Sequence, residues 1–301
     1  MRLIGKDIAE KIYQTLAQRV GELKKSNITP HLVVFLIGEN PASVAYVKQK
    51  QMKGEDIGCK VTILRYDESV TTEELEKKVK ELNGDPTVHA ILIQRPVPTH
   101  IDIDKLELLT DPEKDVDGFH PNSPFTFPIP MAVMKILEEV YSSLRDHEVA
   151  KQSHIGDRHV ANAPRDDSFL DWLKSKNIVI TGKGPTGGGP IITYFQKLNI
   201  NPQIVDSKTN NPDEVFKKAD IIIGAVGKEN IIKPENLKQG VILIGVGIFR
   251  GSDGKLHGDY NPEEIENIAS YYTPTPGGVG PVNVAMLFEN VLTAAEKQGN
   301  N

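Results

Sequence analysis

The sequence predicts an α/β protein of two domains, each built on a parallel sheet that helices cover on both faces. Short runs rich in Val and Ile alternate along the chain with segments of helical periodicity. Strands that are apolar on both faces are typical of parallel sheets. The chain has 301 residues, which favours two domains because a single domain usually has about 150.

The first half of the chain alternates helix and strand signals. Apolar residues recur at helical spacing from Ile8 to Val20, and Asn40-Pro41 has the pattern of an N-cap followed by proline in the first turn. The predicted elements are helices over 3–23, about 42–58 and about 71–84, and strands over 31–38, 60–67 and 89–98. Two prolines end the last of these strands.

The second half repeats this logic. A strand beginning at Asn177 is expected to run into a glycine-rich turn, and a helix over 279–298 is expected to close the chain. Further buried strands are predicted over 201–208, 219–227 and 241–247.

The least regular stretch covers residues 142–171, which are polar and show little apolar periodicity. We interpret it as an exposed loop or a domain boundary. It contains His147, His154 and His159, but their spacing is not that of a metal site on a helix, and no cysteine accompanies them. A solvated loop is therefore favoured, and no metal is predicted.

Composition excludes several classes of protein. The formal net charge of −6 argues against a general nucleic-acid binder, which needs a basic face. Cys59 is the only cysteine, so an intrachain disulfide is excluded and a reducing compartment is the default. The longest apolar run, around residues 241–249, is far shorter than a membrane helix. We expect a soluble, cytoplasmic protein.

The glycine-rich turn has the form G-x-G-x-x-G, with glycines at 182, 184 and 187. It follows an apolar strand and precedes a helical run, which is the context of a dinucleotide-binding loop. Asp206 ends the next strand, where a carboxylate accepts from a ribose 2′-hydroxyl and repels a 2′-phosphate. This favours NAD over NADP, although Ser207 and Lys208 follow directly and would favour a phosphate.

A second group of candidates lies in the first half. Tyr46 and Lys50 are four residues apart on a predicted helix and therefore share a face. A lysine directed into a cleft can stabilise an anion or act as acid or base, whereas the alternative is an ordinary solvated lysine. Gln94 ends an apolar strand, at the edge of the sheet where ligands bind in α/β proteins.

Two loops complete the set of candidates. The turn at residues 115–121 contains aspartates that can accept from the N–H groups of a heterocycle, or simply cap the turn. The loop over residues 273–281 is rich in proline and glycine, which makes it rigid and sharply turned just before the last helix.

Together these segments resemble the bifunctional methylenetetrahydrofolate dehydrogenase/methenyltetrahydrofolate cyclohydrolase family. The resemblance runs through most of the chain, and the order of its motifs makes it specific where no single motif is. The segments are NPASVAYVKQK, ILIQRPVP, KDVDGFHP, the glycine-rich turn, ADIIIGAVGK, GVGI and TPGGVGPVNVAMLFEN.

The resemblance implies two α/β domains around a cleft, with the last helix returning to the first domain. Residues 1–137 with 279–301 would form the folate and catalytic domain. Residues 138–278 would form the Rossmann-type nucleotide-binding domain, with a polar insertion near 142–171. It further implies a homodimer, and tetrahydrofolate derivatives as the ligands, with no nucleic-acid or membrane partner.

The resemblance also assigns roles. Lys50 would be the central catalytic residue with Gln94 as its partner, Tyr46 would orient the folate, and Asp117 would anchor the pterin ring. The substrate site would also include Pro276, Gly277 and Gly278. NAD or NADP would bind at Gly182, Lys183, Gly184, Thr186, Gly187, Gly188, Asp206, Ser207, Val226, Gly227, Gly247 and Ile248.

The implied chemistry is oxidation of 5,10-methylenetetrahydrofolate to the methenyl cation, followed by hydrolysis to 10-formyltetrahydrofolate. This chain departs from the family pattern at Arg95, where the family has an apolar residue, and at Gly184, Gly187 and Gly245 in the nucleotide half. Two alternatives remain open at this point. One is an enzyme with only the dehydrogenase or only the cyclohydrolase activity, and the other is a non-catalytic nucleotide or folate sensor.

Overall fold

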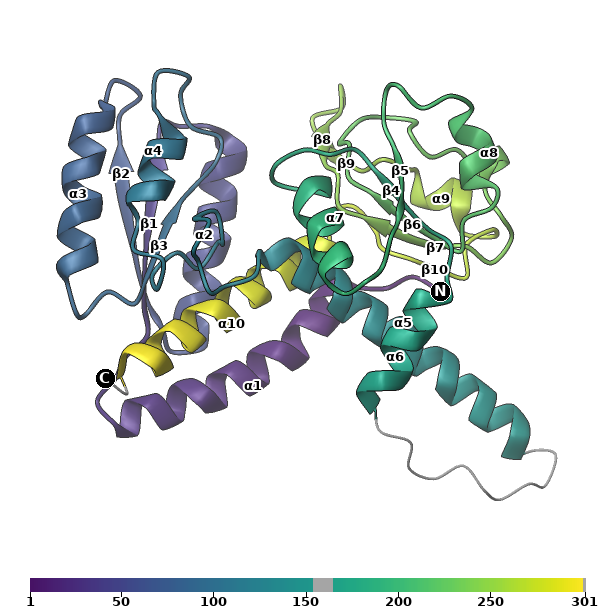
Figure 1. Ribbon diagram of the computed structural model, residues 1–301, viewed down its shortest axis with the longest axis horizontal. Helices are drawn as coiled ribbons and strands as arrows, with labels where there is room; N and C mark the ends of the chain where they lie inside the picture. Colours follow the sequence, from purple (N-terminus) through teal and green to yellow (C-terminus); the bar gives the residue numbers. More distant parts are fainter. Residues whose placement is uncertain (154–164, 300–301) are drawn as a thin grey trace. The chain divides into compact units, whose positions relative to one another are not determined.

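The computed structural model describes residues 1–153 and 165–299, and divides the chain into two compact units. Residues 10–128 and 284–301 form one, here called the Lys50 unit, and residues 1–9 and 129–283 form the other, here called the glycine-turn unit. Helices α1 (Gly5–Lys25) and α10 (Val279–Gly299) each contribute to both (Figure 1). The expected mixed α/β fold is confirmed, and the predicted domain bounds stay a prediction.

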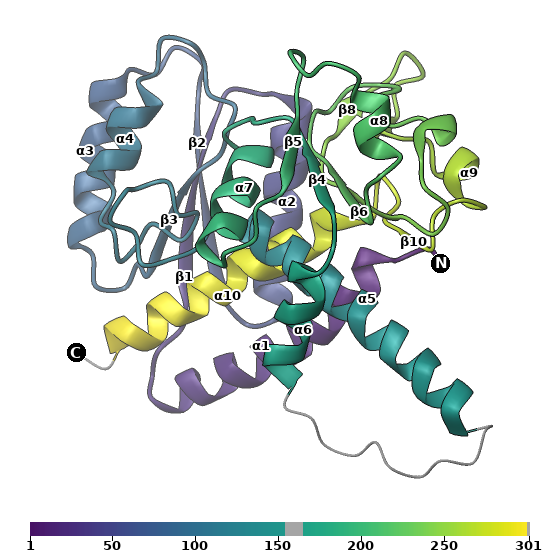
Figure 2. The same ribbon diagram turned by 45° about the vertical axis from the view of Figure 1, so that its right-hand side comes forward.

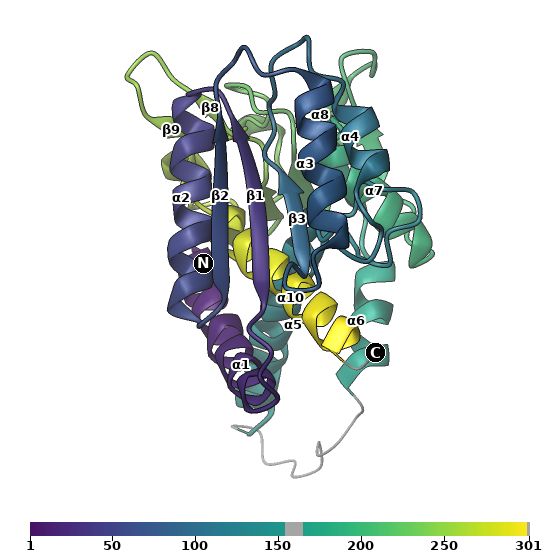
Figure 3. The same ribbon diagram turned by 90° about the vertical axis from the view of Figure 1, so that its left-hand side faces the viewer.

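The Lys50 unit contains a three-stranded parallel sheet in the order β2-β1-β3. The strands are β1 (His31–Ile37), β2 (Lys60–Tyr66) and β3 (Ala90–Ile93). Helix α2 (Pro41–Asp56) lies on one side of the sheet, and α3 (Thr72–Gly84) and α4 (Ile103–Leu109) lie on the other (Figure 3). Every residue of β1 and β3 is buried, as the apolar runs predict.

Local signals in the sequence account for the helix starts in this unit. The Asn40 side chain accepts from the backbone N–H groups of Ala42 and Ser43, so the predicted N-cap is confirmed. Thr71 and Glu74 form a complete capping box at the start of α3. The strand predicted over 89–98 is shorter: β3 ends at Ile93, and the N–H of Gln94 makes a last hydrogen bond to the carbonyl of Phe35, at 2.9 Å, before the prolines.

The glycine-turn unit contains a five-stranded parallel sheet in the order β10-β7-β6-β4-β5. Strands β5, β4, β6 and β10 of this sheet are labelled in Figure 2. Its strands are β4 (Ile178–Thr181), β5 (Gln203–Val205), β6 (Ile221–Gly224), β7 (Ile242–Gly245) and β10 (Tyr271–Tyr272). β4, β6 and β7 are buried along their whole length, whereas β5 is an edge strand with Gln203 exposed. The expectation of a buried strand was therefore wrong for β5, since an edge strand has a neighbour on one side only.

The stretch over 142–171 differs from the loop that was expected. Helix α5 (Pro128–Ser153) continues through its first part, and α6 (Arg165–Lys174) occupies its last part. Aromatic contacts explain the pairing of these helices, because Tyr141 on α5 lies 5.7 Å from Phe169 and 5.4 Å from Trp172, measured between ring centroids. His147 lies on α5, whereas His154 and His159 lie outside the described residues.

Several short elements of the glycine-turn unit were not predicted. They are α8 (Pro212–Phe216), η1 (Pro234–Asn236), β8 (Phe249–Arg250), β9 (Leu256–His257) and α9 (Pro262–Ile265). The helical run expected after the glycine-rich turn is confirmed as α7 (Gly188–Lys197). Within the described part of the chain, no helix has the length and apolar character needed to cross a bilayer.

Candidate active site

Helix α2 presents Lys50 to the interior of its own unit. The buried residues of the helix are Ser43, Val47, Lys50 and Gly54, which recur at helical spacing. A Cβ on Gly54 would lie 2.5 Å from side-chain carbons of Phe288 and Val61, so only glycine lets the helix approach this closely. This close packing leaves Lys50 only 5% exposed.

Lys50, Gln94 and Tyr46 form one cluster, which agrees with the pairing that the family resemblance implies. The Lys50 ammonium donates to Oε1 of Gln94 at 3.0 Å and lies 4.9 Å from the centre of the Tyr46 ring. The Gln94 amide also donates from Nε2 to the carbonyl of Arg95 at 2.6 Å. Because Nε2 is used in this way, Oε1 is left to face Lys50.

Burial sets the charge state of this cluster. Burial lowers the pKa of Lys50, and the nearby carboxylate of Asp117 opposes that shift. Burial also raises the pKa of Asp117, against the influence of Lys50 and Arg95. The neutral amine of Lys50 is therefore more accessible near neutral pH than that of a solvated lysine, which is what an acid–base group requires.

The loop that carries Asp117 is held by Asp115 and by the last helix. The carboxylate of Asp115 accepts from the backbone N–H groups of Gly118 at 3.2 Å and His120 at 2.7 Å, which makes Asp115 the turn-forming member of the pair. The buried Asn290 on α10 donates to the carbonyls of Val116 and Thr126, both at 2.8 Å. Asp117 is thus left as the aspartate that can face a ligand.

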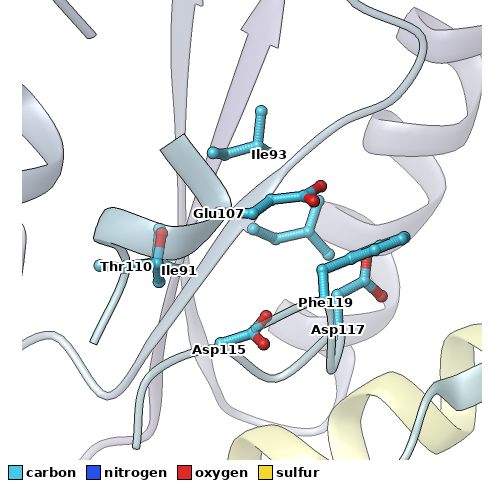
Figure 4. Close-up of a pocket in the computed structure, with 8 residues that line it drawn as sticks. Ile91, Ile93, Glu107, Thr110, Asp115, Asp117 and Phe119 are labelled. Carbon is cyan, nitrogen blue, oxygen red and sulfur yellow. The ribbon is translucent and has the colours of Figure 1, made fainter. Parts of the chain in front are cut away.

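A small pocket opens beside this loop. Figure 4 shows Glu107 from α4 and Asp115, Asp117 and Phe119 from the loop converging on it. Further lining residues are Ile91, Leu92, Ile93 and Thr110. Asp117 lines this pocket, and its carboxylate is also the charge that acts on the pKa of Lys50. The pocket is therefore part of the same candidate site.

Arg95, the departure from the family pattern, lies over this pocket. Its guanidinium binds the Glu107 carboxylate at 2.7 and 2.8 Å and stacks 4.6 Å from the centre of the Phe119 ring. Burial nevertheless raises the pKa of Glu107 to about 7, with Arg95 acting against the shift. Arg95 therefore holds Glu107 and Phe119, two residues of the pocket wall, through an ion pair and an aromatic contact.

The glycine-rich turn connects β4 to α7, as predicted. Gly182 has a positive φ of 79°, and a Cβ there would lie 2.8 Å from the carbonyl oxygen of Ala225. A Cβ on Gly188 would lie 2.2 Å from the carbonyl oxygen of Gly182, whereas one on Gly184 would meet open space. The turn therefore places the exposed backbone of Gly184 beside the N-terminal end of α7, where the helix dipole favours a phosphate.

Asp206 follows β5 and forms an ion pair with Lys183 of the glycine-rich turn, at 2.7 Å. Its carboxylate also accepts from the backbone N–H of Lys208 at 3.0 Å. The hydrogen bond from Lys183 is the first cause that lowers the pKa of Asp206. Asp206, the residue predicted to bind the ribose, therefore lies next to the glycine-rich turn, with the cation of Lys183 beside it. Ser207 follows on the same loop.

The remaining candidates lie at the ends of neighbouring strands. Val226 and Gly227 follow β6, and Gly247 and Ile248 follow β7. Ile248 is 50% exposed, which suits a residue that contacts a ligand. Pro276, Gly277 and Gly278 follow β10 in the glycine-turn unit, where Gly277 accepts from the backbone N–H of Gly5 at 2.9 Å.

The structure thus groups Tyr46, Lys50, Gln94 and Asp117 in one unit, and the predicted nucleotide residues in the other. Sequence reasoning missed Glu107 and Asn290, because each is placed by tertiary contacts rather than by a local motif. Among residues 1–153 and 165–299, no group of three or more His, Cys, Asp or Glu side chains is arranged to hold a metal ion.

Two family models match the chain. Residues 3–117 match the tetrahydrofolate dehydrogenase/cyclohydrolase catalytic domain, and residues 169–299 match the NAD(P)-binding domain of the same family.

Relatives match over nearly the full length. Bifunctional protein FolD of Ligilactobacillus salivarius is 37% identical over 304 residues, which cover 98% of this chain and 96% of that protein. The crystal structure of the bifunctional FolD methylenetetrahydrofolate dehydrogenase/cyclohydrolase from Campylobacter jejuni matches with a TM-score of 0.84 and 34% identity, covering 99% of each chain. A Trypanosoma brucei enzyme of this type, complexed with NADP cofactor and inhibitor, matches with a TM-score of 0.81 and 26% identity, over 99% of this chain and 97% of that one.

Proposed function

Because the chain belongs to the tetrahydrofolate dehydrogenase/cyclohydrolase family, we propose how its own residues divide the work of the family's two reactions. The protein oxidises 5,10-methylenetetrahydrofolate to 5,10-methenyltetrahydrofolate with NAD(P), and hydrolyses that product to 10-formyltetrahydrofolate. The observation that carries the assignment of roles is the hydrogen bond between the buried Lys50 and Gln94.

When bound, oxidised NAD(P) would supply the acceptor for the hydride that leaves the methylene carbon of the folate, and the folate would then be the methenyl cation. The glycine-rich turn fits such a dinucleotide, because its backbone is exposed at Gly184, beside the N-terminal end of α7, where the helix dipole favours phosphate. Asp117 holds the pterin ring by accepting from its N–H groups, and Tyr46 packs against the folate. The protein's contribution to this step is positioning.

Hydrolysis follows at the cationic carbon. Lys50, as the neutral amine, takes a proton from the attacking water as the carbon–oxygen bond forms, and ring opening then gives the 10-formyl product. Bound cationic substrate lowers the pKa of Lys50 further, in the same direction as burial. Gln94 fixes the position of the amine through its Oε1.

The test uses both half-reactions in parallel. Lys50→Met should lower the hydrolysis rate of added methenyl substrate by about 10²-fold or more, the usual range for loss of an acid–base group. Folate binding, measured by equilibrium titration, should stay within a few-fold of wild type. Lys48→Met is the matched control, because Lys48 lies exposed on the same helix. Undiminished hydrolysis in Lys50→Met would remove Lys50 from the mechanism.

The same assays, run on the wild-type protein, decide whether it has both activities or only one. Production of reduced nicotinamide from methylenetetrahydrofolate, together with hydrolysis of methenyltetrahydrofolate, is the expected result. Hydrolysis without reduction would leave a cyclohydrolase alone, and reduction without hydrolysis a dehydrogenase alone. Binding with neither reaction would favour the sensor.

For cofactor choice we propose NAD, because Asp206 follows β5, a position from which a carboxylate would repel a 2′-phosphate. Lys183 partly neutralises that carboxylate, so the preference is expected to be modest. Asp206→Asn removes the repulsion and should shift kcat/KM toward NADP, whereas Lys183→Ala should shift it toward NAD. An enzyme that prefers NADP from the outset would mean that Lys183, Ser207 and Lys208 bind the phosphate.

The assembly and the cellular location are also proposals. A homodimer is expected by analogy with the family, and light scattering on the eluting protein would test it. A cytoplasmic location is supported by the buried, unpaired Cys59, since a reducing compartment keeps such a thiol intact.

A further inference from the structure

We propose that Asp259 is a positioning residue for the dehydrogenase reaction. It orients the loop after β6 so that the backbone carbonyls of Val226 and Gly227 accept from donor groups of NAD(P), its ribose hydroxyls and carboxamide. This inference rests on the proposed function.

The first observation is a buried carboxylate that is held by backbone alone. Asp259 is fully buried, and its carboxylate accepts from three successive N–H groups. Oδ2 accepts from Val226 at 2.9 Å, and Oδ1 accepts from Gly227 at 2.6 Å and from Lys228 at 3.0 Å. A buried charge is costly without such bonds, so the carboxylate and the loop fix each other.

The second observation extends this contact to the loop after β7. A Cβ on Gly247 would lie 2.4 Å from Oδ2 of Asp259 and 2.4 Å from the backbone nitrogen of Gly227. The two loops that the family resemblance assigns to the nucleotide therefore pack backbone against backbone, with the Asp259 carboxylate at their contact. Only glycine permits this approach.

The third step follows from peptide geometry. In a trans peptide the N–H of one residue and the carbonyl of the residue before it point in opposite directions. Three N–H groups turned toward Asp259 therefore turn the carbonyls of Ala225, Val226 and Gly227 away from it. The Ala225 oxygen lies beside the glycine-rich turn, 2.8 Å from the Cβ position of Gly182, in agreement with this orientation.

The two nucleotide loops then present opposite chemistry. The exposed glycine-rich turn offers N–H donors, which suit phosphate oxygens. The loop after β6 offers carbonyl acceptors, which suit hydroxyl and amide donors. Asp259 itself is held by the hydrogen bond from the Ile232 N–H to its carbonyl, at 3.0 Å, so the loop is oriented before a ligand binds.

The test compares binding of ADP, which lacks the nicotinamide half, with binding of NAD(P). In Asp259→Asn an N–H₂ group replaces one acceptor oxygen and opposes the N–H groups of the loop. The dissociation constant for NAD(P) should rise about tenfold or more, which is about 1.4 kcal/mol, while that for ADP stays within about twofold. The KM for NAD(P) should rise in parallel, with hydrolysis of methenyltetrahydrofolate unchanged.

Asp253→Asn is the matched control, because Asp253 also accepts a backbone N–H, from Lys255 at 2.9 Å, but lies exposed in the turn between β8 and β9. If Asp259→Asn does not fold, Asp259→Glu, which keeps the charge but moves both acceptor oxygens by one methylene, should give the same pattern. Unchanged NAD(P) affinity, or equal losses for ADP and NAD(P), would overturn the inference. A wild-type protein that binds NAD(P) without reducing it would overturn only the proposed function.

Discussion

At the scale of single residues, the charge state of Lys50 depends on one neutral neighbour. Gln94 accepts from the Lys50 ammonium without adding a charge, so the effect of burial on the lysine pKa is retained. A carboxylate in the same place would stabilise the ammonium and cancel part of that effect. The choice of glutamine therefore keeps the amine available as a base.

Gln94→Glu should accordingly raise the pKa of Lys50. The hydrolysis rate depends on neutral Lys50, so it rises with pH through that pKa, and the rise should shift to higher pH by about one unit or more. A pH profile of hydrolysis, with Gln94→Asn as the uncharged control, measures the shift. An unshifted profile in the Glu variant would mean that another group supplies the base.

Glu107 gives a second prediction, this time on stability. Its pKa is raised from 4.5 to about 7 by burial. Between these pH values Glu107 holds a proton in the folded protein that it has released in the unfolded chain. The contribution of Glu107 to the free energy of unfolding is therefore largest below pH 4.5 and is lost as the pH rises through about 7.

Glu107→Gln has no such titration. The melting temperature of wild type relative to this variant should therefore fall by a few degrees between about pH 5 and about pH 8. Glu113→Gln, on the exposed surface of the same unit, is the control and should follow wild type. A difference between wild type and Glu107→Gln that stays constant with pH would mean that the ion pair with Arg95 keeps Glu107 ionised throughout.

At the scale of whole elements, α10 holds the loop that carries Asp117. The buried Asn290 donates to two carbonyls of that loop, and losing both bonds leaves buried acceptors unsatisfied. Asn290→Ala should lower the free energy of unfolding by about 2 kcal/mol and raise the KM for methenyltetrahydrofolate several-fold with little change in kcat.

Gln298→Ala tests whether that effect is specific. Gln298 lies near the C-terminal end of the same helix and donates to the carbonyls of His89 and Glu113. Its removal should cost stability without changing KM. Equal changes in KM for the two variants would mean that α10 acts only through general stability.

The elements that sequence predicted well are those with a local physical signal. The cap at Asn40, the alternation of strands and helices, and the turn between β4 and α7 all depend on residues adjacent in the chain. The extension of α5 through polar residues was missed, because the aromatic contacts of Tyr141 that support it come from α6. Burial at the edge strand β5 was misjudged for the same reason, since strand order is not local information.

The candidate site divides in the same way. Lys50, Gln94 and the glycine-rich turn were found because helical spacing, a strand end and a glycine motif mark them. Glu107 and Asn290 have no such mark, since one acts through an ion pair with Arg95 and the other through hydrogen bonds to a distant loop. Tertiary contacts of this kind require the fold before they can be recognised.

At the scale of the whole molecule, neither compact unit is a continuous piece of chain. The Lys50 unit needs residues 284–301 as well as 10–128, and the glycine-turn unit needs residues 1–9 as well as 129–283. The last helix supplies buried side chains to the Lys50 unit, among them Leu287, Phe288, Val291 and Leu292. The folding of the unit that holds Lys50 therefore depends on the end of the chain.

Removing residues 284–301 should consequently unfold the Lys50 unit. Four large buried side chains contribute about 1.5–3 kcal/mol each, which together matches or exceeds the usual stability of a domain, about 5–15 kcal/mol. The truncated chain should lose hydrolysis of methenyltetrahydrofolate completely. Binding of ADP should persist, because the glycine-rich turn and α7 belong to the other unit.

Hydrogen exchange on the truncated chain measures this directly: protection should be lost in β1 to β3 and kept in β4, β6 and β7. Uniform loss of protection would mean that the two units unfold together, and retained hydrolysis would mean that α10 is dispensable for the site.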